Sequence, residues 1–341
     1  MKLRILLYPF SIIYHIITAT RNKLFDIGIL QQKNFNIPII GVGNLNTGGT
    51  GKTPNVAYIA KLLQKQNINV ATLSRGYGRK SKGYILANKE HTALQIGDEP
   101  FELYHNIENL HVAVCENRIN GVEELLKSVK PDAIILDDNF QHRYVKPSLQ
   151  ILLTSYDDFF YDDHILPAGN LRESISGASR ADIVVISKCP ENLGDEQKST
   201  IKKNIYKYTQ APVFFSTYKY GSLYSFNNKN ITTIKDIILV TGLANTDYLK
   251  SYIEQHYNII EHLKYPDHYI YKEEDIKEWG HKYKSNFVTG AVIITTEKDA
   301  ARLQAFNLAI EIPIMVLPIE VDLGAAEKEF DSLISGLTKT Q

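Results

Sequence analysis

Short apolar runs recur along the first part of the chain, and helical stretches lie between them. The clearest are "IPIIGVG", "INVATLS", "LHVAVCE", "DAIILDD", "LQILLTS" and "DIVVISK". They are continuous rather than alternating, which is typical of strands buried on both faces of a parallel sheet. The repeated order of strand and helix predicts an α/β fold with a doubly wound, mostly parallel sheet. In such a fold, ligands bind beyond the carboxyl ends of the strands.

The pattern changes after residue 213. The segment 213–226 is rich in tyrosine and phenylalanine and indicates extended linker strands. Strand, loop and helix then restart at "DIILVTGLANTDYLKSYIEQH" and at "AVIITTEKDAARL", which predicts a second, smaller α/β domain. "IPIMVLPIEVDL" would be a returning strand, followed by a C-terminal helix. The predicted division is an N-terminal helix over 1–26, a core over 27–213 with 318–341 packing back on it, and the smaller domain over 226–312.

The N-terminal segment "MKLRILLYPFSIIYHIITATRNKLFD" is an apolar run between cationic ends. A spanning helix needs about 20 apolar residues, but this run is shorter and contains Pro9, Ser11 and His15. A signal peptide would precede an exported domain, whereas a nucleotide-binding loop follows here. We favour a helix on the membrane surface, with its cationic ends at anionic headgroups. The alternatives are a spanning helix and an amphipathic helix packed on the protein's own core.

The charge balance argues against one class of partner. The chain of 341 residues carries 38 Lys and Arg against 38 Asp and Glu, whereas a general nucleic-acid binder has a basic excess. The two cysteines, Cys115 and Cys189, belong to apolar runs and form no zinc or redox motif. They indicate buried thiols in a reducing compartment.

The stretch "GVGNLNTGGTGKTPNVAYIA" combines a strand end, a glycine-rich loop and a helix start. Asn46 replaces the first glycine of the strict Walker A pattern. The physical requirements survive, because the glycines let backbone N–H groups converge on an anion and the helix adds its positive end. Lys52 would reach the β- and γ-phosphates, and Thr53 would ligate Mg²⁺. The predicted nucleotide-binding residues are Thr47, Gly48, Gly49, Thr50, Gly51, Lys52, Thr53 and Pro54.

Acidic residues follow two further stretches. "AIILDDNFQHR" ends an apolar run in Asp137 and Asp138, as a Walker B strand does, and one of these carboxylates would hold Mg²⁺. "QIGDEPFELY" places Asp98 before an amphipathic run. Asp98 would either cap a helix or accept the proton of an attacking hydroxyl, and the spacing alone leaves both roles open.

Arginines also follow the predicted strands or lie in loops. Arg75 and Arg79 belong to "SRGYGRK", Arg118 to "CENR" and Arg172 to "LPAGNLRE". Each alone indicates no more than a surface charge. Together at one edge of a sheet they favour a second anion site, because guanidinium groups bind phosphate through paired hydrogen bonds.

Seven stretches together resemble one family. "GNLNTGGTGKTP", "SRGYGR", "GDEP", "LDDNFQHR", "LPAGNLRE", "YPDHYIY" and "ITTEKDAARL" have the order and spacing of the tetraacyldisaccharide 4'-kinases. The resemblance runs from about residue 39 to residue 304, and the apolar N-terminus fits it. The departure at Asn46 does not weaken the resemblance, because the loop of that family also lacks the leading glycine.

The resemblance implies transfer of the γ-phosphate of ATP, with Mg²⁺, to the 4'-hydroxyl of a tetraacylated disaccharide 1-phosphate. The product would be lipid IVA, in lipid A (lipopolysaccharide) biosynthesis at the cytoplasmic face of the bacterial inner membrane. The partners would be the lipid substrate and the membrane surface, with no nucleic acid and no obligate protein partner.

The resemblance also implies roles for individual residues. It makes Asp98 the catalytic base, His268 of "PDHY" its partner, and Lys52 the phosphate contact, and so favours catalysis over capping for Asp98. The implied metal ligands are Thr53, Asp137, Asp138 and Glu173. The residues implied to line the substrate and nucleotide cleft are Arg75, Tyr77, Arg118, Gln141, His142 and Arg172.

A membrane-associated P-loop NTPase switch is the main alternative. Such a switch would carry a guanine-reading N-K-x-D motif, but "TEKD" has the wrong spacing and "SKCP" lacks the aspartate. A soluble small-molecule kinase is disfavoured by the basic, apolar N-terminus.

Overall fold

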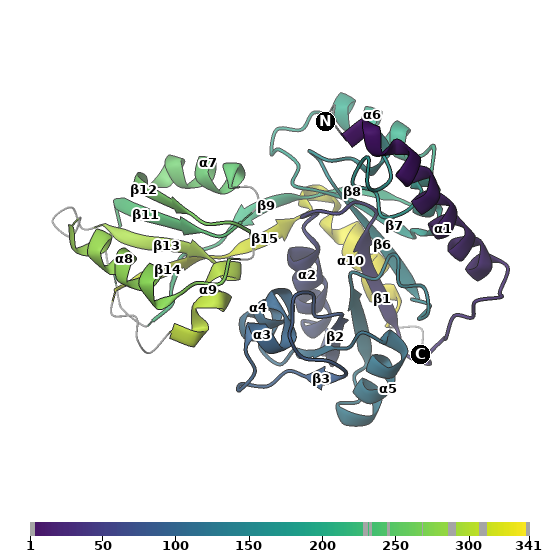
Figure 1. The fold of residues 1–341 in the computed structure, drawn as a ribbon, viewed down its shortest axis with the longest axis horizontal. Helices are drawn as coiled ribbons and strands as arrows, with labels where there is room; N and C mark the ends of the chain where they lie inside the picture. Colours follow the sequence, from purple (N-terminus) through teal and green to yellow (C-terminus); the bar gives the residue numbers. More distant parts are fainter. Residues whose placement is uncertain are drawn as a thin grey trace.

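The computed structural model describes residues 4–227, 231, 234–243, 246–267, 269–285, 291–306 and 312–338. Two sheets of different size lie side by side, and a two-stranded ribbon runs between them (Figure 1). The predicted α/β fold class, with a mostly parallel sheet, a second smaller sheet and extended linker strands, is confirmed.

The larger sheet has eight strands in the order β3-β4-β2-β5-β1-β6-β7-β8. All neighbouring strands are parallel except β3, which is antiparallel to β4. The strands are β1 (Ile39–Asn44), β2 (Val70–Ser74), β3 (Ile85–Leu86), β4 (His111–Val114), β5 (Ala133–Asp137), β6 (Leu149–Ser155), β7 (Ile183–Ser187) and β8 (Val213–Phe215). The carboxyl ends of the parallel strands meet at one edge, which is where the predicted loop begins.

Helices cover both faces of this sheet, which explains why its strands are continuous apolar runs. One face packs on α2 (Lys52–Gln64), α4 (Asp98–Asn106) and α10 (Glu327–Gly336). The other face packs on α5 (Arg118–Ser128) and α6 (Asp195–Ile205). The shorter helical segments of this part are α3 (Ala93–Ile96), η2 (Phe160–Asp162), η3 (Ile175–Arg180) and η6 (Gly324–Ala326).

The smaller sheet has five strands in the order β10-β14-β13-β11-β12, parallel except for β10. Its strands are β10 (Tyr224–Ser225), β11 (Asp236–Thr241), β12 (Asn258–Lys264), β13 (Val292–Thr296) and β14 (Ile314–Leu317). Its helices are α7 (Asp247–His256), α8 (Glu273–Ser285), α9 (Glu297–Leu303) and the short η5 (Gln304–Phe306). The fully buried Trp279 of α8 anchors one of its two apolar layers.

An antiparallel ribbon of β9 (Thr217–Tyr220) and β15 (Ile319–Asp322) joins the two sheets. The stretch predicted as one returning strand is divided at Pro318 into β14 and β15. The smaller sheet therefore extends past the predicted boundary at 312, because β14 pairs with β13 and β10. The other domain boundaries stay a prediction.

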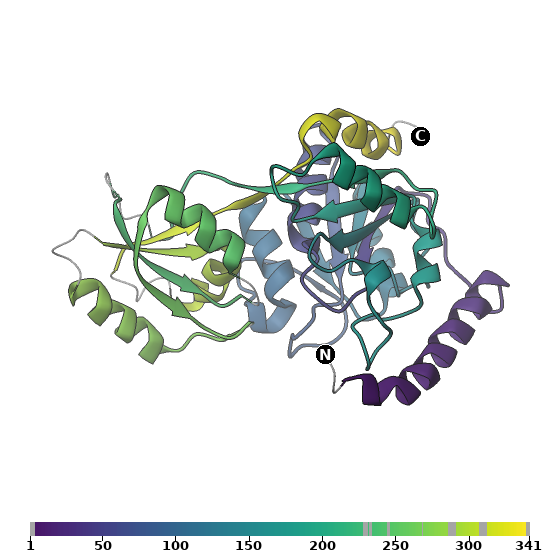
Figure 2. The ribbon, with the colours of Figure 1, turned by 90° about the horizontal axis from the view of Figure 1, so that it is seen from above.

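The N-terminal helix α1 (Tyr8–Asp26), preceded by the turn η1 (Arg4–Leu7), lies along the outside of the larger sheet's layers (Figure 2). Among the described residues, no helix combines the length and the apolar character that crossing a bilayer requires.

The first testable feature is the packing of α10. The Phe330 ring is 1% exposed and meets the rings of Tyr58 and Phe214 edge to face, whereas Leu333 on the same helix is 40% exposed. We expect Phe330→Ala to lower the free energy of unfolding by about 3–5 kcal/mol. We expect Leu333→Ala to change it by less than about 0.5 kcal/mol. Urea unfolding of both variants measures the difference, and equal losses would contradict this packing.

Candidate nucleotide and active site

The glycine-rich loop joins β1 to α2 at the carboxyl edge of the larger sheet. Gly51 is the N-cap residue of α2 and has a φ of 76°. A Cβ at this position would lie 2.4 Å from the Tyr218 hydroxyl oxygen, so only glycine fits. Within the described part of the chain, the N–H groups of Gly49, Gly51 and Lys52 donate to no backbone carbonyl. These N–H groups at a helix start form a ready anion site.

Contacts from the end of β7 and from the segment at Asn170 fix the shape of the loop. The Ser187 hydroxyl donates to the Thr50 carbonyl at 2.8 Å, and the Thr47 N–H donates to the Asn170 carbonyl at 2.7 Å. Lys188, which follows β7 with a φ of 58°, donates from Nζ to the Gly49 carbonyl. Sequence reasoning missed this second lysine, since it treated "SKCP" only as a failed guanine-reading motif. A lysine directly after a buried strand at the loop's edge was the available signal.

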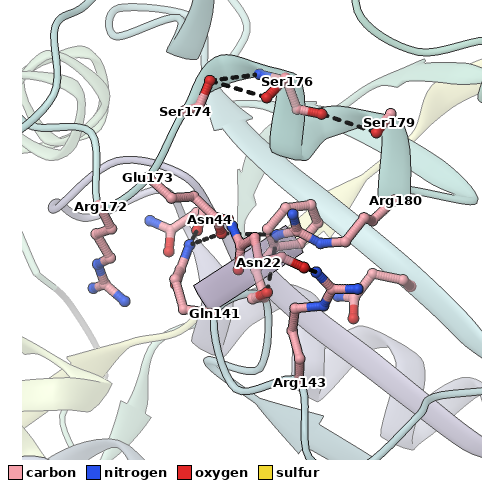
Figure 3. Close-up of polar contacts among 12 residues, drawn as sticks. Asn22, Asn44, Gln141, Arg143, Arg172, Glu173, Ser174, Ser176, Ser179 and Arg180 are labelled. Carbon is pink, nitrogen blue, oxygen red and sulfur yellow. Dashed lines mark hydrogen bonds and ion pairs between the residues drawn. The ribbon is translucent and has the colours of Figure 1, made fainter. Parts of the chain in front are cut away.

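Two cations meet Asp138 beside the loop. Lys52 Nζ lies 3.4 Å from Asp138 Oδ1 and 3.3 Å from Asn44 Oδ1. Arg172 Nη1 lies 2.9 Å from both oxygens of the same carboxylate. Burial alone would raise the pKa of Asp138, but the charges of Lys52 and Arg172 outweigh burial and hold the pKa below its usual value. Figure 3 shows the Arg172 side chain directed away from the neighbouring Glu173.

Asp137 is the last residue of β5 and is 1% exposed. Its Oδ1 atom is buried and has no hydrogen-bond partner among the described residues. Burial, and then the charge of Glu99, raises the pKa of Asp137. No three His, Cys, Asp or Glu side chains in the described ranges gather closely enough to hold a metal alone. The orphaned oxygen, with Thr53 at the start of α2, fits a Mg²⁺ ion that takes its remaining ligands from phosphate and water.

Glu173 occupies a different environment, shown in Figure 3. It is fully buried, and its Oε1 accepts from Arg180 Nη2 at 2.8 Å and from Gln141 Nε2 at 3.1 Å. Its Oε2 accepts from the Asn22 amide of α1. Gln141 also donates to the Asn44 carbonyl at 2.8 Å. Glu173 thus joins α1 to the end of β1, and its predicted role as a metal ligand finds no support in this arrangement.

Arg118 is buried beside Asp137, and His142 is half-buried close to Arg118. Arg118 is 2% exposed, and it donates from Nη1 to the Cys115 carbonyl at 2.6 Å and from Nη2 to the Asp137 carbonyl at 3.4 Å. Burial lowers the pKa of Arg118 to about 10. Burial, and then the charge of Arg118, lowers the pKa of His142 to about 4. His142 is therefore a neutral imidazole at pH 7.

Arg75 and Tyr77 lie on the loop after β2, and both are exposed. The charge of Arg75 acts on both Arg118 and His142. The ends of β2, β4 and β5 thus bring three of the predicted cleft residues within electrostatic reach of one another.

Asp98 is the first residue of α4, and Gly97 is its N-cap residue, so the capping alternative for Asp98 is wrong. Arg302 of α9 donates from Nε to Asp98 Oδ2 at 3.1 Å, and its Nη2 forms an ion pair with the same oxygen at 3.0 Å. His268, the predicted partner of Asp98, lies outside the described residues. Sequence reasoning missed Arg302 and its ion-pair partner Asp299, although "TTEKDAARL" places both on the helix that follows a buried strand.

Comparisons with known proteins give a consistent result. A model of the family described as "Tetraacyldisaccharide-1-P 4'-kinase" (LpxK) matches residues 3–339. The chain is 44% identical over 340 residues to a tetraacyldisaccharide 4'-kinase of Flavobacterium psychrophilum, with 97% of this chain and 96% of that protein covered. It is 41% identical over 336 residues to the protein of the same name from Bacteroides thetaiotaomicron, with 93% and 88% covered. A crystal structure of the "apo" form of LpxK from Aquifex aeolicus in complex with ATP covers 98% of this chain and 99% of its own, at 30% identity and a TM-score of 0.78.

Glu102 provides a test of the contact between α4 and α9. Burial, and then the charge of Glu297 on α9, raises the pKa of Glu102 from 4.5 to about 8. Below about pH 4.5 this carboxyl is protonated in both states, and its contribution to stability is lost as the pH rises through 8. We expect Glu102→Gln, which cannot ionise, to raise Tm relative to wild type at pH 8 and to change it little at pH 4.

Thermal unfolding at both pH values measures the effect. Glu108→Gln, in the exposed turn after α4, is the matched control. A Glu102→Gln effect of the same size at pH 4 and pH 8 would contradict the raised pKa.

Proposed function

The chain belongs to the tetraacyldisaccharide-1-P 4'-kinase family, and on this basis we propose that it transfers the γ-phosphate of ATP to the 4'-hydroxyl of a tetraacyldisaccharide 1-phosphate. The product is lipid IVA, an intermediate of lipid A biosynthesis. The family predicted from the motifs is thereby confirmed. The site observation that carries the proposal is the meeting of Lys52 with Asp138 at the start of α2, in a chain whose family match spans nearly its whole length.

Lys52 and the loop amides account for most of the catalysis that we propose. Phosphoryl transfer depends chiefly on positioning and on stabilising negative charge. The N–H groups of Gly49, Gly51 and Lys52, which donate to no backbone carbonyl among the described residues, would bind the β- and γ-phosphates, and Lys52 Nζ adds a full positive charge. Lys188 and Ser187 hold the loop carbonyls and so preserve this geometry. ATP as the donor is supported further by the ATP complex of the similar Aquifex aeolicus structure.

Asp98 is the residue that we propose as the general base. The 4'-oxygen bonds to the γ-phosphorus, the bond from phosphorus to the β,γ-bridging oxygen breaks, and ADP leaves. The hydroxyl proton passes to the Asp98 carboxylate. His268 is proposed as the partner of Asp98 from its position in "PDHY". Arg75, Tyr77, Arg118, Gln141, His142 and Arg172 are proposed as lining residues of the substrate and nucleotide cleft.

Thr53, Asp137 and Asp138 are the residues that would hold Mg²⁺. When bound, the ion neutralises charge on the phosphates. Asp137 suits this role because its buried Oδ1 has no partner among the described residues. Asp138 stays ionised through its contacts with Lys52 and Arg172, and it keeps both cations beside the loop.

The helix α1 supports a membrane surface as the place of action. Its polar side faces the protein, where Ser11 Oγ donates to the Ile165 carbonyl and Tyr14 Oη donates to the Arg172 carbonyl, each at 3.0 Å. Its apolar side faces outward. The exposed apolar residues of this segment are Leu6, Leu7, Tyr8, Phe10, Ile12, Ile13, Ile16 and Ile17.

A helix that packs on the protein's own core has the opposite orientation, with its apolar side inward and its polar side in solvent. An exposed apolar patch of this kind marks an interaction site. We therefore propose that α1 lies on the cytoplasmic face of the bacterial inner membrane, where it brings the site to a lipid substrate.

The transfer reaction is the direct test. We expect γ-labelled ATP to label tetraacyldisaccharide 1-phosphate in detergent only when Mg²⁺ is present. Asp98→Asn should lower kcat by about 10²–10⁴-fold, while retaining ATP binding. Nucleotide hydrolysis with no labelled lipid would contradict the proposal and favour the NTPase switch. Near-normal transfer by Asp98→Asn would remove Asp98 from the mechanism.

The role of α1 has a separate test. Ile12 and Ile16 are 51% and 57% exposed, so Ile12→Ser with Ile16→Ser should leave Tm unchanged. Cosedimentation with vesicles that contain an anionic phospholipid should fall about tenfold or more, because two apolar side chains no longer enter the interface. Leu333→Ser on α10, at the opposite side of the larger sheet (Figure 2), is the matched control. Unchanged vesicle binding by the double variant would argue against α1 as the membrane contact.

A further inference from the structure

Arg302 is a charged side chain from the smaller sheet's unit that reaches the proposed base. We propose that Arg302 is a positioning residue for phosphoryl transfer: it fixes the Asp98 carboxylate and makes a competent base depend on the seating of α9 against α4. This inference rests on the function proposed above and extends it to a residue outside the larger sheet.

The contact has the geometry of a clamp. Nε and Nη2 of Arg302 lie 3.1 Å and 3.0 Å from the same oxygen, Oδ2 of Asp98. The Arg302 side chain is 4% exposed and the Asp98 side chain 23%. Two nitrogens of one rigid plane against a single oxygen restrict the position of that oxygen. A general base has to be held in this way, because a displacement of about 1 Å from the reacting group costs roughly 10²-fold in rate.

The guanidinium is itself held by the smaller sheet. Arg302 Nη1 donates to the Gly242 carbonyl and to Asp299 Oδ1, each at 3.0 Å. Asp299 is fully buried and also accepts from the Gly242 N–H at 3.0 Å, the Tyr271 hydroxyl at 3.1 Å and the Thr296 hydroxyl at 2.9 Å. A Cβ on Gly242 would lie 2.9 Å from Asp299 Oδ1, so a larger residue does not fit there. Arg302 is therefore a preorganised arm rather than a mobile surface side chain.

The clamp forms only where the two units touch. Both Figure 1 and Figure 2 show α9 beside α4. Ala301, next to Arg302, packs into an apolar cluster with Ile96, Phe101 and Val114 of the larger unit. Separation of the units would expose this cluster and remove Arg302 from Asp98 in one movement. Contact of the smaller unit with α4 thus positions the Asp98 carboxylate, in the way that closure of a lid positions the residues of an active site.

Arg302 is also a positive charge among mostly acidic side chains. Glu99 and Glu102 share α4 with Asp98, and Glu297 and Lys298 lie on the facing α9. Without Arg302, the described charges in this seam would be Glu99, Glu102 and Glu297 against Lys298. Like charges favour protonation, so loss of the guanidinium should move the ionisation of the base to higher pH.

Steady-state transfer by full-length Arg302→Met and Arg302→Lys variants, with ATP and tetraacyldisaccharide 1-phosphate in detergent, is the experiment. For Arg302→Met we expect kcat to fall about a hundredfold, with KM for ATP within about twofold of wild type because the phosphate loop is untouched. The acidic limb of its kcat profile should move to higher pH. Arg302→Lys, which keeps the charge but not the fork, should recover part of both effects.

Lys282→Met is the matched control, since it removes a lysine that pairs with Glu261 within the smaller unit and away from α4. It should keep the wild-type kcat and pH profile. A folded Arg302→Met variant with wild-type kcat and an unmoved acidic limb would overturn the proposal. A variant with a lower Tm and a lower kcat, but with the acidic limb of its kcat–pH profile unmoved, would also overturn the proposal. That result is expected if Arg302 only stabilises the fold and does not act on the base.

If Arg302→Met does not fold, Arg302→Lys decides, and a wild-type kcat and profile for the lysine variant would overturn the proposal. The wild-type reaction separates this inference from the function on which it rests. Absence of labelled lipid with the wild-type protein defeats the proposed function. Normal wild-type transfer with an unchanged Arg302→Met variant defeats only the role of Arg302.

Discussion

Burial of the larger sheet on both faces is the constraint from which the site follows. The α2, α4 and α10 helices cover one face and α5 and α6 cover the other, so the carboxyl edge is where strand ends can present polar groups to a ligand. Asn44, Asp137 and Ser187 are buried polar residues at the ends of β1, β5 and β7. Each contacts the phosphate loop or lies next to a residue that does. The same packing that stabilises the fold therefore concentrates charge and hydrogen-bond donors at one place.

The sequence predicted those parts of the structure that depend on local pattern. The buried strands of the larger sheet are continuous apolar runs because both faces are covered, and the phosphate loop needs glycine and lysine at fixed spacing, so both were found. The contact of Asp98 with Arg302 spans 204 residues of sequence, and no local pattern reports it. The role of Glu173 as a metal ligand stays a prediction. Arg180 lies seven residues further along the chain, but Asn22 and Gln141 come from distant segments, and together they pair with a carboxylate that its motif alone suggested was available for metal. The boundary at 312 was misplaced because β14 and β15 form one apolar run, and only strand pairing shows that they belong to different sheets.

The N-terminal helix shows how the same local pattern can support opposite structures. Its apolar run fits either a core helix or a membrane helix. The two structures differ in which side of the helix contacts the rest of the protein. Here the polar side does, since Ser11, Tyr14 and Asn22 donate hydrogen bonds to it, while the isoleucines are exposed. Burying the polar side leaves the apolar side exposed, at a cost of about 25 cal/mol for each Å² of apolar surface left in water. A lipid surface would remove that cost, which links the proposed membrane contact to the stability of the helix as well as to its function.

The residues of the proposed active site come from both units. The larger unit supplies the loop, Lys52, Asp137 at the end of β5 and Asp138 directly after it. The described contacts from Ser187, Lys188, Asn44 and Arg172 that hold them belong to the larger unit as well. Asp98 also belongs to the larger unit, yet a guanidinium anchored on Asp299 of the smaller unit holds its carboxylate. In this proposal, ATP binding depends on the phosphate loop, whereas positioning of the Asp98 base depends on Arg302. A nucleotide could therefore bind before Arg302 holds the Asp98 carboxylate. For the proposed transfer to a lipid acceptor, that separation would have a consequence: a base that is positioned only when α9 is seated against α4 would limit transfer of phosphate to water before the lipid hydroxyl is in place.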